Sequence, residues 1–208
     1  MKTLSYIHRF EPATQAGTPP LLLLHGTGGN ENDLLQVGRQ LAPGSALLSP
    51  RGDVSEHGMP RFFRRFAEGV FDLEDVARRT QGLANFVRDA AGQYGFAPDR
   101  LTALGYSNGA NIATSLLLLR PETLAGAVLL RPMVVLQPKQ LPDLRGKRIA
   151  IISGRHDPIV PVDQPETLAA MFRDAGAEVE LHWLETGHQL SGADLRLAGQ
   201  FLSVPARA

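Results

Sequence analysis

The 208-residue chain alternates short, almost continuously apolar runs with longer amphipathic stretches, and this alternation constrains its fold. Short apolar runs of this kind are typical of parallel strands that are covered on both faces. Strands that alternate with helices predict an α/β fold, with a mostly parallel sheet of about seven strands and helices on both faces. The expected strands are Leu4–Phe10, Leu21–His25, Ala46–Ser49, Leu101–Tyr106, Ala127–Leu130, Ile149–Ser153 and Val179–Leu184.

Helical periodicity fills most of the gaps between these strands. Asp72 and Asp163 stand where the second and fourth helices would need a cap, and Pro121 would end the third. The irregular residues 50–69 are expected to form either a loop wall over a site or a solvated connection. The expected helices are Asn32–Leu41, Leu73–Tyr94, Asn108–Leu119, Gln164–Ala175 and Ala193–Phe201.

Length and composition narrow the class of protein. A chain of 208 residues fits a single domain, predicted here as residues 1–208. Lys and Arg total 21, as do Asp and Glu, and this balance argues against nucleic acid as a partner. The absence of cysteine excludes disulfides, thiolate zinc sites and a cysteine nucleophile. No apolar run approaches a membrane span, and residues 1–9 lack the apolar core of a signal peptide, so we expect a cytoplasmic protein without membrane insertion.

The sharpest local signal is Gly-x-Ser-x-Gly at residues 105–109, between an apolar strand and a helical pattern. This context is the one that a nucleophile elbow requires, because the serine must sit on a tight turn at the top of the sheet. Gly105 and Gly109 would let strand and helix approach closely. Ser107 is therefore the predicted nucleophile.

The glycine-rich loop at residues 25–30 follows the strand Leu21–Leu24 and has the composition expected of half an oxyanion hole. The predicted donors are the backbone N–H groups of Thr27 and of Asn108, the residue after the nucleophile. The loop lacks the motifs of a P-loop and of a dinucleotide-binding turn. His25 lies at a strand end before the nucleophile, and we expect a structural role for it.

The acid and the base should follow the nucleophile in the order Ser, Asp, His. Asp157 follows the strand Ile149–Ser153, and His188 follows the strand Val179–Leu184. The carboxyl ends of parallel strands share one edge of a sheet, so both side chains should reach Ser107. His188 is the predicted general base and Asp157 the residue that orients it.

Other residues could fill the same roles. Asp163 is an alternative acid, although its place before a helix suits a cap. Of the remaining histidines, His156 should point away from its neighbour Asp157, and His182 lies mid-strand. No pair of histidines has metal-ligand spacing, so neither a metal nor a cofactor is expected.

Together these motifs resemble the bacterial carboxylesterase/phospholipase family of α/β hydrolases, which includes acyl-protein thioesterase-like enzymes. The resemblance covers nearly the whole chain and is nearest to the branch linked to quinone or hydroquinone resistance. The segments that carry it are residues 24–34, 48–52, 59–63, 105–111, 154–161 and 187–188.

The resemblance implies an α/β-hydrolase fold without a large lid, short-chain ester substrates and frequent homodimers. It also places the oxyanion donors at Thr27 and Asn108. The thioesterases usually have glutamine after the nucleophile, so Asn108 is a departure that bears on substrate choice. Members of the quinone-linked branch have been labelled dioxygenases. The sequence lacks the 2-His-1-carboxylate pattern of a non-haem iron site, so we do not expect that activity.

The sequence thus predicts a serine hydrolase that cleaves carboxylic esters of small or medium acyl chains through an acyl-enzyme on Ser107. Met59, Phe62 and Phe63 are expected to border its substrate pocket. A thioesterase or lysophospholipase with the same triad is the alternative. A ligand-binding protein on a retired hydrolase scaffold is a further alternative from another class.

Overall fold

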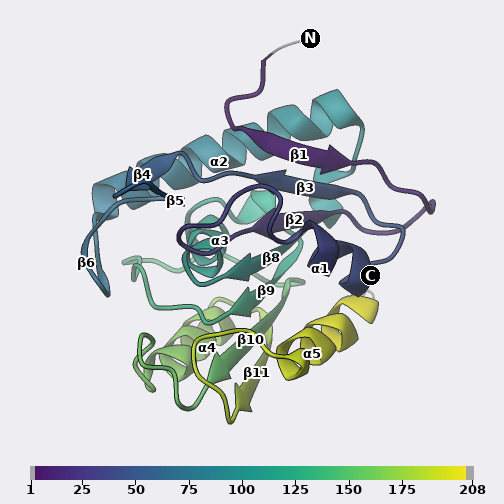
Figure 1. Cartoon of the computed structure of the whole chain (residues 1–208). Coiled ribbons are helices and arrows are strands. Elements are labelled where there is room, and N and C mark those ends of the chain that lie inside the picture. Colours follow the sequence, from purple (N-terminus) through teal and green to yellow (C-terminus); the bar gives the residue numbers. More distant parts are fainter. Residues whose placement is uncertain (1–2, 205–208) are drawn as a thin grey trace.

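A computed structural model describes residues 3–204, so the predicted domain extends beyond the described residues at both ends. Its main sheet has seven strands in the order β1-β3-β2-β8-β9-β10-β11 (Figure 1). Strand β1 pairs antiparallel with β3, and all the remaining strand pairs of this sheet are parallel. The predicted α/β class and sheet are confirmed. The strands are β1 (His8–Glu11), β2 (Leu21–Leu24), β3 (Leu47–Pro50), β8 (Thr102–Tyr106), β9 (Gly126–Leu130), β10 (Arg148–Gly154) and β11 (Glu178–Leu184).

Helices cover both faces of this sheet, as predicted. Helices α2, α3 and α4 lie on one face, and α1 and α5 lie on the other (Figure 1). Among the described residues, no helix combines the length and apolarity needed to cross a bilayer. The helices are α1 (Leu35–Leu41), α2 (Leu73–Tyr94), α3 (Asn108–Leu119), α4 (Gln164–Asp174) and α5 (Gly192–Ser203), with 3₁₀ turns η1 (Pro98–Arg100) and η2 (Pro121–Thr123).

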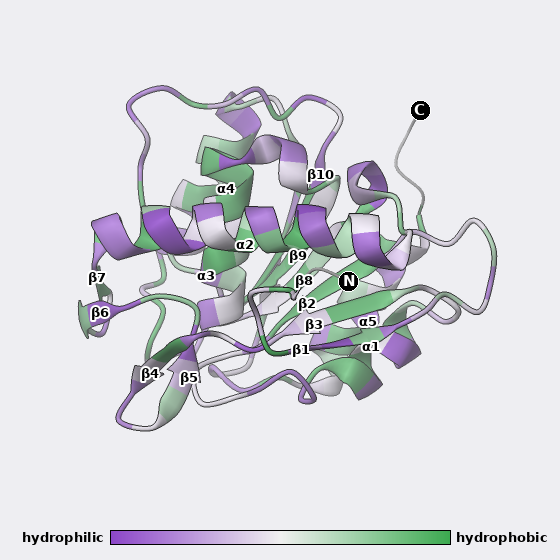
Figure 2. Cartoon of the chain, turned by 90° about the horizontal axis from the view of Figure 1, so that it is seen from above, coloured by the Kyte–Doolittle hydropathy of each residue, from purple (hydrophilic) through white to green (hydrophobic). Residues whose placement is uncertain are grey.

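The continuous apolar runs are explained by a core on each side of the sheet. In β2, Leu22 and Leu24 pack into the core under α2, α3 and α4, whereas Leu21 and Leu23 pack into the core under α1 and α5. Alternate residues of a strand point to opposite faces, so a doubly covered strand must be apolar at every position. Figure 2 shows this as hydrophobic colouring along the central strands, while α2 alternates between hydrophobic and hydrophilic residues.

The predicted helix ends are largely correct. The Asp72 carboxylate accepts a hydrogen bond from the Asp75 N–H at 3.1 Å and caps α2. Asp163 stands at the N-cap of α4 but its side chain makes no capping bond, so the prediction was right only for its position. Pro121 opens a 3₁₀ turn directly after α3, because its missing N–H cannot continue the helix.

Residues 50–69 form structure that the sequence analysis did not predict. The segment and the residues just after it contain two small hairpins, and Figure 1 shows both at the edge where the parallel strands end. Strands of two or three residues carry too little periodicity to be detected. The hairpins are β4 (Val54–Glu56) with β5 (Met59–Arg61), and β6 (Arg65–Ala67) with β7 (Val70–Phe71).

A glycine substitution tests the packing of α3 on β2. A Cβ added at Gly109 would lie 2.0 Å from the Leu24 carbonyl oxygen. We expect Gly109→Ala to lower the free energy of unfolding by about 3 kcal/mol, because two backbone segments would have to separate. Gly92→Ala is the matched control, since nothing lies within 4 Å of its Cβ position in α2. Urea denaturation should show a small gain for the control, and equal effects of the two variants would contradict the packing argument.

Candidate active site

Ser107 occupies the turn between β8 and α3. Its backbone has a φ of 52° and a ψ of −114°, a conformation that a residue with a side chain rarely adopts. The Ser107 N–H donates to the Leu130 carbonyl of β9 at 2.8 Å, and the Ser107 carbonyl accepts from the Asn111 N–H at 2.9 Å. These two bonds anchor the turn on both sides and direct the hydroxyl away from the sheet.

The structure brings Ser107, His188 and Asp157 together, although they come from three separate loops. The distance from His188 Nε2 to Ser107 Oγ is 3.0 Å, and that from His188 Nδ1 to Asp157 Oδ2 is 2.8 Å. The other Asp157 oxygen accepts the backbone N–H groups of Ile159 at 2.8 Å and Val160 at 3.1 Å. The Asp157 side chain is only 1% exposed, so its charge faces the imidazole with little competition from water. Asp157 is thus the acid that contacts the histidine, and Asp163 is not.

The glycine-rich loop reaches the same place from β2. Thr27 and Asn108 both line a cavity beside Ser107. Within residues 3–204, neither of their backbone N–H groups donates to a protein acceptor. Free N–H donors beside the nucleophile are what the stabilisation of an oxyanion requires.

His25 is held between backbone groups, which supports the structural role expected for it. Its Nδ1 lies 2.7 Å from the Gly26 carbonyl, and its Nε2 accepts the Gly52 N–H at 2.9 Å. A ring that accepts at Nε2 must be neutral and carry its proton on Nδ1. Burial lowers the pKa of His25 below its usual value. The histidine therefore joins the oxyanion loop to the segment after β3.

The other histidines lie apart from Ser107. His156 pairs with Glu185 and His182 with Glu180, while His8 contacts Tyr94 Oη. His57 has a φ of 51° in the β4–β5 turn. In the part of the chain that the structure describes, no cluster of three or more His, Asp or Glu side chains could hold a metal ion.

Arg131, which was not predicted as a site residue, is a fully buried arginine at the end of β9 with a φ of 57°. Its Nη1 donates to Asp194 Oδ1 at 2.6 Å, and Asp194 is also fully buried. The same guanidinium donates to the Gly187 carbonyl at 2.9 Å and the Thr186 hydroxyl at 3.0 Å. Arg131 therefore fixes the loop that carries His188. No local signal reveals this, because the partners lie more than fifty residues further along the chain.

A cavity of about 260 Å³ opens beside Ser107 and His188. The expected pocket residues do not line it. Phe62 and Phe63 are 1% and 0% exposed, because each packs into the core beneath the hairpins. Met59 is 41% exposed and lies against the Gly28 position of the oxyanion loop.

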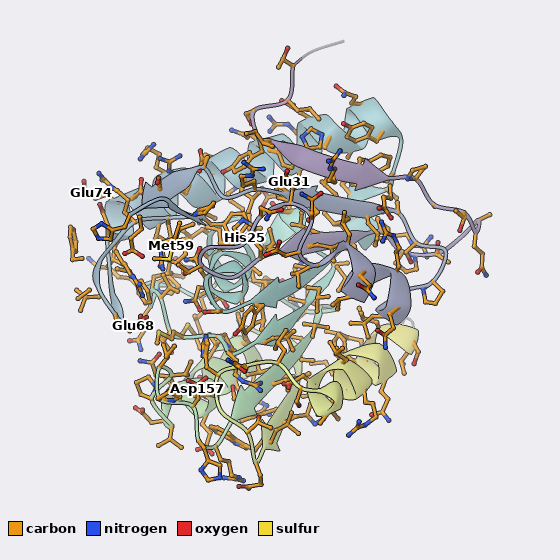
Figure 3. All side chains as sticks on the ribbon, in the orientation of Figure 1. His25, Glu31, Met59, Glu68, Glu74 and Asp157 are labelled. Atoms are coloured by element: carbon orange, nitrogen blue, oxygen red, sulfur yellow. The ribbon has the colours of Figure 1, made fainter. Side chains whose placement is uncertain are left out.

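The hairpin segment nevertheless contributes to the cavity wall, but mainly through charged side chains. Arg61, Arg65 and Glu68 line it together with Phe71. Figure 3 shows Glu68, Met59 and Asp157 on the same side of the molecule, where the parallel strands end. The prediction of an apolar border was thus wrong for Phe62 and Phe63, whose rings pack into the core. Met59 is exposed, but it does not line the cavity either.

Comparisons with known proteins show the family to which the chain belongs. The model of the phospholipase/carboxylesterase family matches residues 7–205. Over 184 residues the chain is 47% identical to MhqD of Bacillus subtilis (strain 168), which bears a hydrolase name, and the match covers 88% of this chain and 91% of the relative. The chain belongs to the phospholipase/carboxylesterase family of hydrolases.

Two carboxylesterases of known structure share the fold of this family member. The Bacillus cereus carboxylesterase is 45% identical with a TM-score of 0.93, covering 95% of this chain and 93% of its own. The Mesorhizobium loti carboxylesterase is 33% identical with a TM-score of 0.90, covering 99% of this chain and 98% of its own.

Removal of Arg131 should be costly in this hydrolase. Arg131→Met would leave the Asp194 carboxylate buried and unpaired, and we expect a loss of about 3–5 kcal/mol in the free energy of unfolding. Arg145→Met is the matched control, because the Arg145–Asp143 pair is exposed and should contribute less than about 1 kcal/mol. Urea denaturation measures both. An Arg131 variant no less stable than the control would show that the buried pair does not hold the loop.

His25 should make stability depend on pH. Its lowered pKa means that the unfolded chain takes up a proton on His25 below about pH 6.5, whereas the folded chain resists it. The stabilisation is therefore complete above that pH and is lost as the pH falls toward the folded pKa. We expect His25→Gln to reduce the stability difference between about pH 7.5 and about pH 5. The control His156→Gln, at an exposed site, should show the same pH dependence of stability as the wild type. If His25→Gln also kept the wild-type pH dependence, His25 would not be its source.

Proposed function

We propose that this hydrolase cleaves carboxylic esters of small or medium acyl groups through an acyl-enzyme on Ser107. The observation that carries the proposal is the continuous hydrogen-bond chain from Ser107 Oγ through both nitrogens of His188 to Asp157. A serine hydroxyl is a weak nucleophile until an adjacent base takes its proton. His188 is such a base, within hydrogen-bond distance of the Ser107 hydroxyl.

In the first half of the reaction, Ser107 Oγ attacks the ester carbonyl carbon while His188 Nε2 accepts the hydroxyl proton. The C–O bond to the leaving alcohol then breaks, and the imidazolium gives its proton to that alcohol. In the second half, water attacks the acyl-enzyme, His188 accepts the water proton, and the proton returns to Ser107 Oγ as the acid leaves.

Asp157 keeps His188 in the tautomer that this sequence needs. By accepting from Nδ1 at 2.8 Å, its carboxylate leaves Nε2 unprotonated and ready to act as a base. When the imidazolium forms, the buried negative charge stabilises it. The backbone N–H donors of Ile159 and Val160 fix the carboxylate in that orientation.

The N–H groups of Thr27 and Asn108 complete the mechanism by binding the carbonyl oxygen as it becomes negative. Asn108 begins α3, so the positive end of the helix dipole adds to this stabilisation. The cavity of about 260 Å³ supports small or medium acyl groups rather than long chains.

Hydrolysis of p-nitrophenyl butyrate tests the proposal. We expect Ser107→Ala to lower kcat/KM by at least about 10³-fold, because the nucleophile is lost while the oxyanion donors remain. Ser203→Ala is the control, since Ser203 is an exposed serine at the end of α5.

The circular dichroism spectra of both variants should match the wild type, which separates loss of chemistry from loss of fold. If Ser107→Ala retained the wild-type rate, Ser107 would not be the nucleophile. If the wild type released no p-nitrophenol from this ester or its shorter homologues, the ester hydrolase proposal itself would be wrong.

A further inference from the structure

The polar side chains around Ser107 offer hydrogen-bond donors to the cavity and almost no free acceptors. Asn111 shows how this arises. Its Oδ1 accepts the Met133 N–H at 2.7 Å. A backbone N–H can bond only to the oxygen of an amide, so this contact fixes the side chain and leaves the NH₂ group for a ligand.

Asn108 is fixed in the same way. Its Oδ1 accepts the Phe62 N–H at 2.8 Å, and its Nδ2 is buried without a hydrogen-bond partner in the described part of the chain. Both asparagines line the cavity. A buried amide nitrogen without an acceptor is costly, and a bound acceptor would remove that cost.

Arg61 adds a positive charge to the same wall. Its side chain is 3% exposed, and its Nη1 donates to the Thr27 hydroxyl at 2.6 Å. Its Nη2 has no acceptor among residues 3–204. Because the Thr27 oxygen accepts from Arg61, the Thr27 hydroxyl proton is also free to be donated.

The charge of Arg61 is only weakly neutralised. The nearest carboxylate oxygen, on Glu56, lies 3.5 Å away, and the Glu56 carboxylate also accepts Arg65 at 2.9 and 3.0 Å. Glu68, the acidic residue of the cavity wall, is itself bound to Arg65. Arg61 is therefore a buried cation with unused N–H donors, which is the complement of a carboxylate.

We propose that the substrate carries a carboxylate a few bonds from the scissile carbonyl, and that Arg61 and Asn111 recognise it. The proposed substrate class is the monoester of a short dicarboxylic acid. This inference rests on the proposed ester hydrolysis and narrows it. The neutral side of the wall, formed by Phe71, Met133 and Ile159, would contact the carbon chain between the two carbonyl groups.

Two matched ethyl esters test the proposal, monoethyl succinate and ethyl 4-methylpentanoate, in which an isopropyl group replaces the carboxylate. We expect the wild type to hydrolyse monoethyl succinate with a kcat/KM at least about tenfold higher, the factor that one charge-assisted hydrogen bond supplies. Acid release in a pH-stat measures both rates. A ratio of one or less would overturn the substrate assignment while leaving ester hydrolysis intact.

Variants locate the effect. Asn111→Asp keeps the oxygen that accepts from Met133 and replaces the NH₂ donor by a second oxygen, so the preference for monoethyl succinate should fall by at least about tenfold. Arg61→Gln should reduce the same ratio. Arg88→Gln removes an equal charge from the exposed face of α2 and should leave the ratio unchanged. Unchanged ratios in both cavity variants would contradict the proposal.

A binding measurement keeps the two proposals separable. Titration calorimetry of Ser107→Ala with monoethyl succinate needs no turnover, so it reports recognition even if the hydrolytic proposal fails. We expect saturable binding that weakens by at least about tenfold when Asn111→Asp is added. Binding no tighter than that of ethyl 4-methylpentanoate would overturn the carboxylate assignment.

Discussion

Helix α3 touches strand β2 at Gly109, where even a methyl group would lie 2.0 Å from the Leu24 carbonyl oxygen. This contact places the helix directly over the strand ends and forces the chain to turn sharply at Ser107. The turn holds Ser107 in a conformation that costs about 1–3 kcal/mol. The buried sheet offsets that cost, since the Ser107 N–H is bonded to β9. The rest of the proposed site is arranged around the fixed position of this hydroxyl.

Two buried arginines line the cavity and have opposite environments. Arg131 donates to Asp194 and to the loop around His188, so its charge is neutralised and its donors are used. The nearest carboxylate to Arg61 is that of Glu56, at 3.5 Å, and Arg61 keeps free N–H groups on the cavity wall. The first arginine stabilises the position of the base, and the second gives the cavity the charge that we assign to substrate recognition.

Local features of the sequence were sufficient for the fold and for the residues proposed to react. Strand, turn and helix around Ser107 are adjacent in sequence, and Asp157 and His188 each follow a strand that the apolar pattern predicts. The carboxyl ends of parallel strands meet at one edge, so the sequence alone predicts that these three residues lie together. Several strand and helix ends differ from the prediction by one to four residues, as at α1, which begins at Leu35 rather than Asn32, and at β1, which begins at His8 rather than Leu4.

Features that depend on distant partners could not be predicted. The pairing of Arg131 with Asp194 spans 63 residues, and nothing near either residue indicates it. The sequence does not distinguish a pocket wall from a core for Phe62 and Phe63, because aromatic residues suit both. Only the hairpins, which bury both rings and turn Arg61 toward Thr27, decide between these roles.

Covalent acylation of Ser107 can be detected by mass spectrometry of the enzyme quenched during turnover of p-nitrophenyl butyrate. We expect a protein heavier by one butyryl group, with the added mass on the peptide that contains Ser107 and absent from Ser107→Ala. An adduct on another residue, or the same added mass in Ser107→Ala, would contradict acylation of Ser107.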